Sequence, residues 1–328
     1  MNQPRRHHYI AQMFLAGFTN AGTKDGKLWM ADLNRAYHKN CRPDGIAYSR
    51  DFYRVDIPDV DPFIIERELA ALEGDVATIL KDVLENKKFR GETDLSLLLN
   101  FVALQMAKTP AMRETNAKPV VAVADRTMAL ILKDSETYYS TLEGARNAGI
   151  DISANVSYEK MKWAFDHNRI IASTSQNWDV ISSLEMADAA LPILHDRNWT
   201  LIVPEKENDV FICSDHPVIV YWLDDKIVRR PPGLGLRGTA VFIPLGSNMA
   251  LRGVFEDAPP SIVVDAKQVA SYNVLTLMNS YGQIYSRDES FKAINPAGDI
   301  VQLSVAELAA DPTVYLTKVN GIVGETIN

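Results

Sequence analysis

The hydrophobic pattern of this chain changes its period near Asn198, and that change constrains the fold more than any other feature of the sequence. Before Asn198, apolar residues recur at alternating four- and three-residue steps, the spacing of one buried helix face. The clearest stripe consists of Ile65, Leu69, Leu72, Val76, Ile79 and Val83. After Asn198, short β-branched and aromatic runs alternate with Pro, Gly, Asp and Asn, as in an antiparallel sheet. The chain therefore combines a helical part with a strand-rich part.

Helices are predicted through most of residues 61–197. The first has clear end signals, because Asp61 can cap it, Pro62 suits its first turn, and Lys87 and Lys88 complement the dipole at its other end. Further helices are predicted in DLSLLLNFVALQMAK, AKPVVAVADRTMALILKDSETYYSTLEGARN, SYEKMKWAFDHN and NWDVISSLEMADAALPILH. Pro119 is expected to break or to start one of them.

Strands are predicted on both sides of this helical block. On the C-terminal side they are NWTLIVPE, DVFICSD, HPVIVYWL, KIVRRP, TAVFIPL and MALRGVF, followed by a helix in DAKQVASYNVLTLMNSY and a closing strand GQIYS. On the N-terminal side, an amphipathic YIAQMFLAGF precedes two extended segments, KLWMADL and GIAYSRDFYRVD.

These patterns predict an α+β fold, in which a mostly antiparallel sheet is built from N- and C-terminal segments and a large helical block is inserted between them. The strand at 27–33 should pair within the sheet formed by 199–245. We expect a single domain over 1–328, with an N-terminal sheet segment 1–60, a helical block 61–197, a sheet segment 198–290 and a C-terminal tail 291–328.

The net charge of −8 argues against a broad surface for nucleic acid or anionic membrane, because positive surface attracts those partners. Nucleic acid is expected to bind only through a local basic patch. The cysteines are Cys41 and Cys213, and one distant pair cannot form the disulfide framework of a small secreted domain. The sequence contains no run of about 18 apolar residues, so no membrane span is expected. We expect a cytoplasmic protein.

Two of the six histidines, His7 and His8, are adjacent and follow two arginines. Adjacent side chains point about 100° apart on a helix or to opposite faces of a strand, so both rarely serve one site. In a structural interpretation, one imidazole packs under the sheet and the other is solvated. In a functional interpretation, His8 faces a site. The apolar residues of the segment that follows form a stripe, and position 8 lies beside this stripe when the stripe is extended back by one helical turn. His7 then orients the site or faces an anion.

Glu66 and Glu73 are two helical turns apart, so they share one face beside the apolar stripe. Each carboxylate either reaches solvent or points into a site. Gln105 follows Phe101 by four residues, which places its amide on an apolar helix face where it needs hydrogen-bond partners. It either bridges to backbone or orients a substrate or a site carboxylate.

Asp215 lies in FICSDHPVIVYW, where a polar Ser-Asp-His triplet interrupts a nearly continuous run of strand residues. Pro217 also disfavours pairing within a central strand. The structural interpretation is an Asx-type turn between two strands. The functional interpretation is a site at the end of a strand, where binding residues are commonly placed.

Together, the candidate catalytic residues are His7, His8, Glu66, Gln105 and Asp215, and the candidate metal ligands are His8, Glu66, Glu73 and Asp215. Histidine with carboxylates suits a divalent Mg²⁺, Mn²⁺ or Zn²⁺ ion, which activates water and stabilises charge on a phosphoryl oxygen. The candidate contacts to a phosphate are Arg5, Arg6, Lys108 and Arg113.

These residues favour a metal-assisted hydrolase acting on a small-molecule or phosphodiester ligand, with a phosphodiesterase or nuclease as the leading candidate. The alternative is a non-catalytic module that senses a ligand or binds a protein. The sequence contains no G-x-S-x-G, Walker or H-E-x-x-H motif. The glycine-rich PPGLGLRG at 231–238 precedes a strand rather than a helix, so no nucleotide cofactor is expected.

Several short stretches also occur in the order of a known family. They are HHYIAQMFLAGF at the N-terminus, Phe52 and Tyr53, IERELAALE at 65–73, LQMAKTP at 104–110, ICSDHPV at 212–218 and FIPL at 242–245. The chain thereby resembles an uncharacterised, mostly bacterial family catalogued as domain of unknown function 4238, from residue 7 to about residue 286. The family pattern usually has Pro at position 11, Arg at position 108 and often Asn at position 216. The resemblance implies a domain and not a reaction.

Overall fold

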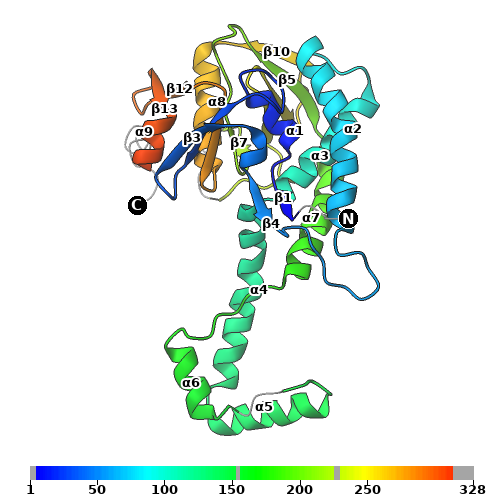
Figure 1. Ribbon diagram of the computed structural model, residues 1–328, viewed down its shortest axis with the longest axis vertical. Coiled ribbons are helices and arrows are strands. Elements are labelled where there is room, and N and C mark those ends of the chain that lie inside the picture. The colour runs from blue at the N-terminus through cyan, green and yellow to red at the C-terminus, as the bar shows by residue number, and fades with distance from the viewer. Residues whose placement is uncertain (1–4, 153–155, 225–229, 313–328) are drawn as a thin grey trace.

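The computed structural model describes residues 5–152, 156–224 and 230–312 of the chain. Its body packs sheets and long helices together, and a helical arm projects from this body (Figure 1). The arm consists of the outer part of α4 (Pro110–Ile131), α5 (Ser135–Asn147) and α6 (Tyr158–Asp166).

The larger sheet of the described residues has the strand order β10-β5-β9-β8-β7. Its strands are β5 (Asn198–Pro204), β7 (Ile219–Trp222), β8 (Thr239–Gly246), β9 (Met249–Val254) and β10 (Ser261–Val264). Neighbours are antiparallel except β10 and β5, which are parallel. Every residue of β8 is buried, in keeping with its nearly continuous apolar sequence.

A second sheet joins distant segments in the order β3-β2-β11-β6. Its strands are β2 (Leu28–Asp32), β3 (Tyr37–Cys41), β6 (Cys213–Ser214) and β11 (Gln283–Ser286). The N-terminal strand β2 therefore shares a sheet with β6, through β11. The prediction that N- and C-terminal segments build a common antiparallel sheet is therefore confirmed. The other strands described between residues 198 and 254 form the larger sheet without β2, so β2 shares a sheet with only part of that region.

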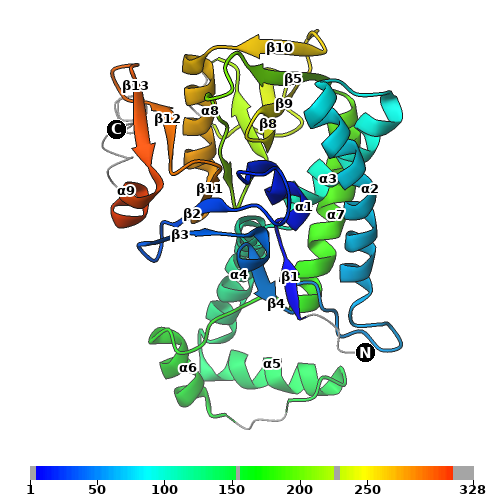
Figure 2. The same cartoon turned by 45° about the horizontal axis from the view of Figure 1, so that its top comes forward.

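The helical block between the strand segments is confirmed, and its body part contains α2 (Ile64–Asn86), α3 (Glu92–Ala107) and α7 (Gln176–His195). In α2 the predicted stripe faces the core, where Leu69, Val76, Ile79 and Val83 are buried. Helix α3 packs against both α2 and α7, so the three helices form one layer beside the larger sheet (Figure 2).

Helix α4 is continuous although Pro119 lies inside it, so the expectation that Pro119 breaks or starts a helix is wrong. Pro119 is exposed, and the carbonyl that loses its hydrogen-bond donor there can bind water instead. The Thr109 hydroxyl caps the helix by accepting a hydrogen bond from Met112 N. Beyond the proline, Val123 and Leu130 are 64% and 69% exposed, since this part of α4 has left the body.

The N-terminal segment enters as β1 (Arg6–His8), which pairs with β4 (Tyr48–Arg50). Helix α1 (Gln12–Leu15) and the 3-10 turn η1 (Ala16–Phe18) follow, and a second 3-10 turn, η2 (Pro43–Gly45), precedes β4. Ile10, Phe14 and Phe18 are fully buried. Their burial fixes the N-terminal segment between α2 and the end of β8.

The C-terminal part is folded rather than a simple tail. Strands β12 (Ser290–Ile294) and β13 (Ile300–Ser304) form a hairpin, and α8 (Ala266–Asn279) and α9 (Val305–Ala310) pack with it. The expected tail at 291–328 is therefore structured up to residue 312, and 313–328 lies outside the described residues. The expected strand KIVRRP includes 226–229, which also lie outside them.

Candidate functional site

His7 is fully buried and anchors the N-terminal strand to the segment after β4. Its Nδ1 accepts a hydrogen bond from the backbone N–H of Tyr53 at 2.9 Å, and the two rings stack with centroids 5.8 Å apart. The Phe63 ring meets His7 edge-on. The geometry gives His7 a structural contact on each side.

His8 is the histidine that lines a cavity, and it is only half-buried. Gln12 Nε2 lies 3.3 Å from its Nδ1, and burial lowers the pKa of His8, so the ring is neutral at pH 7. His8 thus lines a cavity, whereas the role of His7 in orienting a site or facing an anion stays a prediction. Position 8 lies in strand β1, and the helix begins only at Gln12, so the apolar stripe cannot be extended back to it.

Glu66 and Glu73 lie on one face of α2, as their spacing predicts, and both line the same cavity as His8. Glu66 Oε2 is 3.9 Å from His7 Nδ1. Burial, with a contribution from the negative charge of Glu73, raises the pKa of Glu66 to about 7. Glu66 is therefore a carboxyl group that gains and loses a proton near neutral pH.

Lys108 is the buried positively charged residue that pairs with Glu73, and its side chain is only 4% exposed. Its Nζ donates to Glu73 Oε1 at 3.1 Å and lies 5.5 Å from the centroid of the Tyr53 ring. Burial by itself lowers the pKa of Lys108, but Tyr53 and Glu73 raise it overall. The ammonium group therefore stays charged and forms an ion pair with Glu73. Burial also raises the pKa of Tyr53 to about 12, so its hydroxyl stays neutral.

Gln105 is fully buried on α3, three residues before Lys108 and on the same side of the helix. Neither polar atom of its amide has a hydrogen-bond partner within the described part of the chain. The bridge to backbone that one interpretation required is therefore not made there. A role in orienting a ligand or a carboxylate stays a prediction.

Asp215 follows β6 and binds the segment that leads from α8 into β11. Its carboxylate accepts backbone hydrogen bonds from Tyr281 at 2.8 Å, Gly282 at 3.3 Å and Gln283 at 2.9 Å. Burial raises the pKa of Asp215 to about 6, although these N–H donors favour the charged form. The next residue, His216, bonds Thr109 Oγ1 through Nδ1 at 2.9 Å. The partners of the Asp215 carboxylate belong to a distant segment, so the arrangement differs from the Asx-type turn within its own segment that one interpretation of Asp215 expected.

The four basic residues expected to bind phosphate are engaged by the protein itself. Arg5 Nε donates to Asp51 at 2.9 Å, and Arg6 lies over the Tyr48 ring. Arg113 stacks 3.4 Å from the centroid of the Phe52 ring and donates to the Phe52 carbonyl, and burial lowers its pKa to about 10. The fourth, Lys108, pairs with Glu73 as described.

Lys24 is the basic residue that sequence reasoning missed. It is exposed in the loop after η1, and no hydrogen bond or ion pair holds its Nζ among the described residues. It lines the cavity of His8, Glu66 and Glu73, whose volume is about 240 Å³. No pattern around Lys24 in the sequence distinguishes it from a solvated loop lysine.

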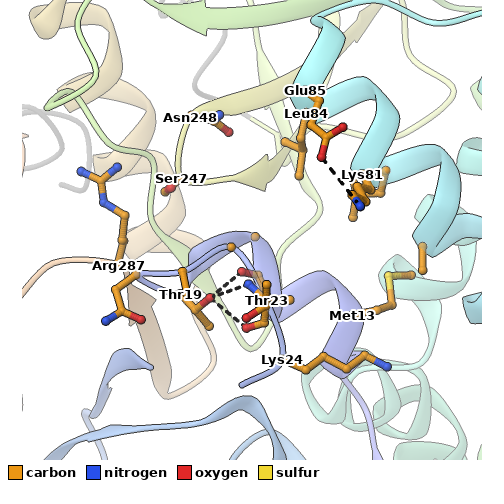
Figure 3. Close-up of a pocket in the computed structure, with 17 residues that line it drawn as sticks. Met13, Thr19, Thr23, Lys24, Lys81, Leu84, Glu85, Ser247, Asn248 and Arg287 are labelled. Atoms are coloured by element: carbon orange, nitrogen blue, oxygen red, sulfur yellow. Dashed lines mark hydrogen bonds and ion pairs between the residues drawn. The ribbon is translucent and has the colours of Figure 1, made fainter. Parts of the chain in front are cut away.

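A larger cavity of about 730 Å³ adjoins the first, and Met13, Lys24 and Ala77 line both. Figure 3 shows Lys24 and Met13 on one side of the larger cavity and Leu84 on another. The two cavities therefore form one groove along α2, with Lys24 at their junction.

Within the described ranges, no group of three or more His, Cys, Asp or Glu side chains is arranged to hold a metal ion. The four candidate metal ligands divide between two places, because Asp215 bonds the backbone of residues 281–283 while the others line the smaller cavity. A divalent ion at this cavity would have to draw its ligands together on binding.

One family model matches the chain, that of the protein family of unknown function DUF4238, over residues 6–290. The chain belongs to this family. No curated protein and no solved structure matches it. In the DUF4238 protein, several of the stretches that carry the resemblance meet at the site: they supply His8, Tyr53, Glu66, Glu73 and Lys108. Among the described residues, no helix is long and apolar enough to span a membrane.

Proposed function

We propose that this protein is a hydrolase of small phosphodiesters, with Glu66 as its general base. The observation that carries the proposal is the cavity itself. Its lining includes a carboxyl group with a pKa of about 7, that of Glu66, and the exposed Lys24, whose ammonium makes no ion pair among the described residues. General bases work best when their pKa is near the operating pH.

The neighbouring residues support a division of roles between the two carboxylates. Lys108 pairs with Glu73, and the charge of Glu73 helps to raise the pKa of Glu66. Pairs of titratable groups whose surroundings separate their pKa values are typical of acid–base sites. Glu66 then acts as the proton-transferring group and Glu73 as a fixed negative charge.

In the proposed reaction, the Glu66 carboxylate accepts a proton from water while the water oxygen forms a bond to phosphorus. The bond between phosphorus and the leaving oxygen breaks, and Glu66 returns the proton to that oxygen. The products are an alcohol and a phosphomonoester, and Glu66 is again a carboxylate. Lys24 stabilises the charge on the non-bridging oxygens. With a net charge of −8, a small substrate fits this chain better than nucleic acid.

A divalent cation remains part of the proposal, with His8 and Glu73 as the ligands nearest the cavity, so that Glu66 stays free to act as the base. Mg²⁺, Mn²⁺ or Zn²⁺ bound there would lower the pKa of the attacking water. The assay therefore compares each ion with buffer that contains a chelator.

The test measures hydrolysis of bis(p-nitrophenyl) phosphate by the wild type, Glu66→Gln and Lys24→Met, with Lys88→Met as an exposed control. We expect Glu66→Gln to lower kcat/KM by about 10²–10⁴-fold. Lys88→Met should leave kcat/KM unchanged, and thermal melts should show all variants folded. Wild-type activity should rise with pH through about 7, because the base must be ionised.

Two results would contradict the proposal. Glu66→Gln could retain full activity while folded, which would exclude Glu66 as the base. Alternatively, the wild type could bind phosphodiesters without turning them over, which would favour the ligand-sensing alternative.

A further inference from the structure

The larger of the two cavities has room for much more than the phosphate group at which the proposed reaction takes place. Its volume of about 730 Å³ compares with about 240 Å³ for the cavity that contains Glu66. Sites for small organic ligands typically measure about 300–1,000 Å³, so only the larger cavity is of that size. A substrate that occupies both must be asymmetric.

The walls of the larger cavity differ in polarity. On one side, Met13 from α1 and Leu80 and Leu84 from α2 present apolar surface. On the other side, Ser247 and Asn248 lie at the turn between β8 and β9 (Figure 3). A flat heterocycle fits an apolar wall, and hydroxyl and amide groups opposite it can bind sugar hydroxyls or ring nitrogens.

Two glycines, one of which lines this cavity, allow the backbones of η1 and of the end of β8 to approach closely. A Cβ at Gly17 would lie 2.9 Å from the Leu245 carbonyl oxygen, and one at Gly246 would lie 3.2 Å from the Gly17 carbonyl oxygen. The two backbone segments touch, and Ser247 N donates to Gly17 O at 2.9 Å. Any side chain at these positions would force the segments apart.

The charge of the larger cavity favours an anion. Lys24, Lys81 and Arg287 line it, whereas Glu85 is the acidic residue of its lining. Glu85 lies 3.9 Å from Lys81, and Arg287 is paired with Asp288, so Lys24 is the cation left for a ligand. Lys24 also stands at the junction, where a phosphate joining two substituents would lie.

We propose that the substrate is an asymmetric phosphodiester of a nucleoside. The nucleoside occupies the larger cavity, the phosphate lies at Lys24, and a smaller substituent occupies the cavity of Glu66. This inference rests on the proposed function. Water adds to phosphorus, the bond to the smaller substituent's oxygen breaks and that oxygen takes the proton, which releases a small alcohol and a nucleoside monophosphate.

The first test compares two chromogenic substrates with the same leaving group, the p-nitrophenyl ester of thymidine 5′-monophosphate and bis(p-nitrophenyl) phosphate. We expect the wild type to favour the nucleotide ester at least tenfold in kcat/KM. Asn248→Trp fills the larger cavity, so it should bring the ratio close to one. Lys88→Met, just past the end of α2, should keep the wild-type ratio.

The second test does not depend on turnover. Calorimetry measures the binding of thymidine 5′-monophosphate to Glu66→Gln, with and without Asn248→Trp, and we expect at least a tenfold rise in Kd with the added tryptophan. Equal affinities of the two folded proteins, or a wild-type ratio near one, would overturn the inference and leave the proposed function intact. Absence of hydrolysis with both substrates would refute the proposed function, while the calorimetric comparison would still decide the inference.

Discussion

Lys108 shows how one buried side chain sets the charge of its neighbours. Its ammonium pairs with Glu73 at 3.1 Å and leaves Glu66, on the same face of α2, without a comparable partner. Both glutamates share the same residue type and helix face, but only Glu73 has Lys108 as its partner, and burial raises the pKa of Glu66. The difference between the two carboxyl groups therefore depends on their surroundings and not on their positions in α2.

The raised pKa of Glu66 predicts a pH-dependent stability. In the unfolded chain Glu66 loses its proton near the ordinary pKa of a glutamate, whereas in the folded protein it does so only near pH 7. Protonated Glu66 therefore favours the folded state. This contribution to the free energy of unfolding is fully present at low pH and is lost as the pH rises through 7. Glu66→Gln should therefore stabilise the fold at pH 8, by up to about 3 kcal/mol, and should be nearly neutral at pH 4. Urea unfolding at the two pH values measures this, and an equal effect at both would contradict it.

Loss of the buried cation should be costly. Lys108→Met leaves the Glu73 carboxylate without its partner, and removal of one member of a buried pair typically costs about 3–5 kcal/mol. Because Glu73 is 25% exposed, we expect the lower end of that range. The control is Lys118→Met, which breaks an exposed pair with Glu114 and should cost less than about 1 kcal/mol. Similar losses for the two variants in denaturant unfolding would argue against a buried pair.

Helix α2 is the element on which the site is built. One of its faces carries the apolar stripe that packs against the core, and an adjoining face carries Glu66, Glu73 and Ala77 along the groove. A helix of 23 residues spans roughly 35 Å, so a single rigid element contributes to both cavities. The distance between the two ends of the groove is therefore set by helix geometry.

Two glycines near α2 should respond in opposite ways to alanine. Gly74 lies inside α2, and a Cβ there meets no atom within 4 Å, so Gly74→Ala should stabilise the protein by about 1 kcal/mol. Gly17→Ala should destabilise it by at least about 1–3 kcal/mol, because its Cβ would overlap the backbone at Leu245. Thermal melts compare the two, and a stabilised Gly17→Ala would show that the segments can move apart.

On the scale of the whole molecule, the body and the arm differ in how much they bury. Helix α3 buries most of its second half, whereas in α5 the buried residue is Tyr138 and α6 has none among the described residues. Local stability follows the number of buried apolar contacts. The arm should therefore open without unfolding the body.

Hydrogen exchange provides the measurement. We expect amide protons of α5 and α6 to exchange at least a hundredfold faster than those of α3, because opening the arm exposes little apolar surface. Equal protection in the three helices would instead show that the arm unfolds only together with the body.

The sequence by itself determined the elements. The four- and three-residue spacing placed the buried face of α2, and the shift to short β-branched runs placed the strands of residues 198–254. The same spacing put Glu66 and Glu73 on one face, because neighbours within a helix depend only on local geometry. Residues of one element can therefore be grouped from the sequence alone.

Only the tertiary structure decided which elements meet. It brought Lys108 to Glu73, made His7 rather than His8 the fully buried histidine, and turned Asp215 toward the backbone of 281–283. It also placed Lys24 between two cavities, where no local pattern marks it. These contacts join segments far apart in the chain, so they depend on how whole elements pack. Hydrophobic periodicity indicates which face of an element is buried, but it does not indicate which other element covers that face.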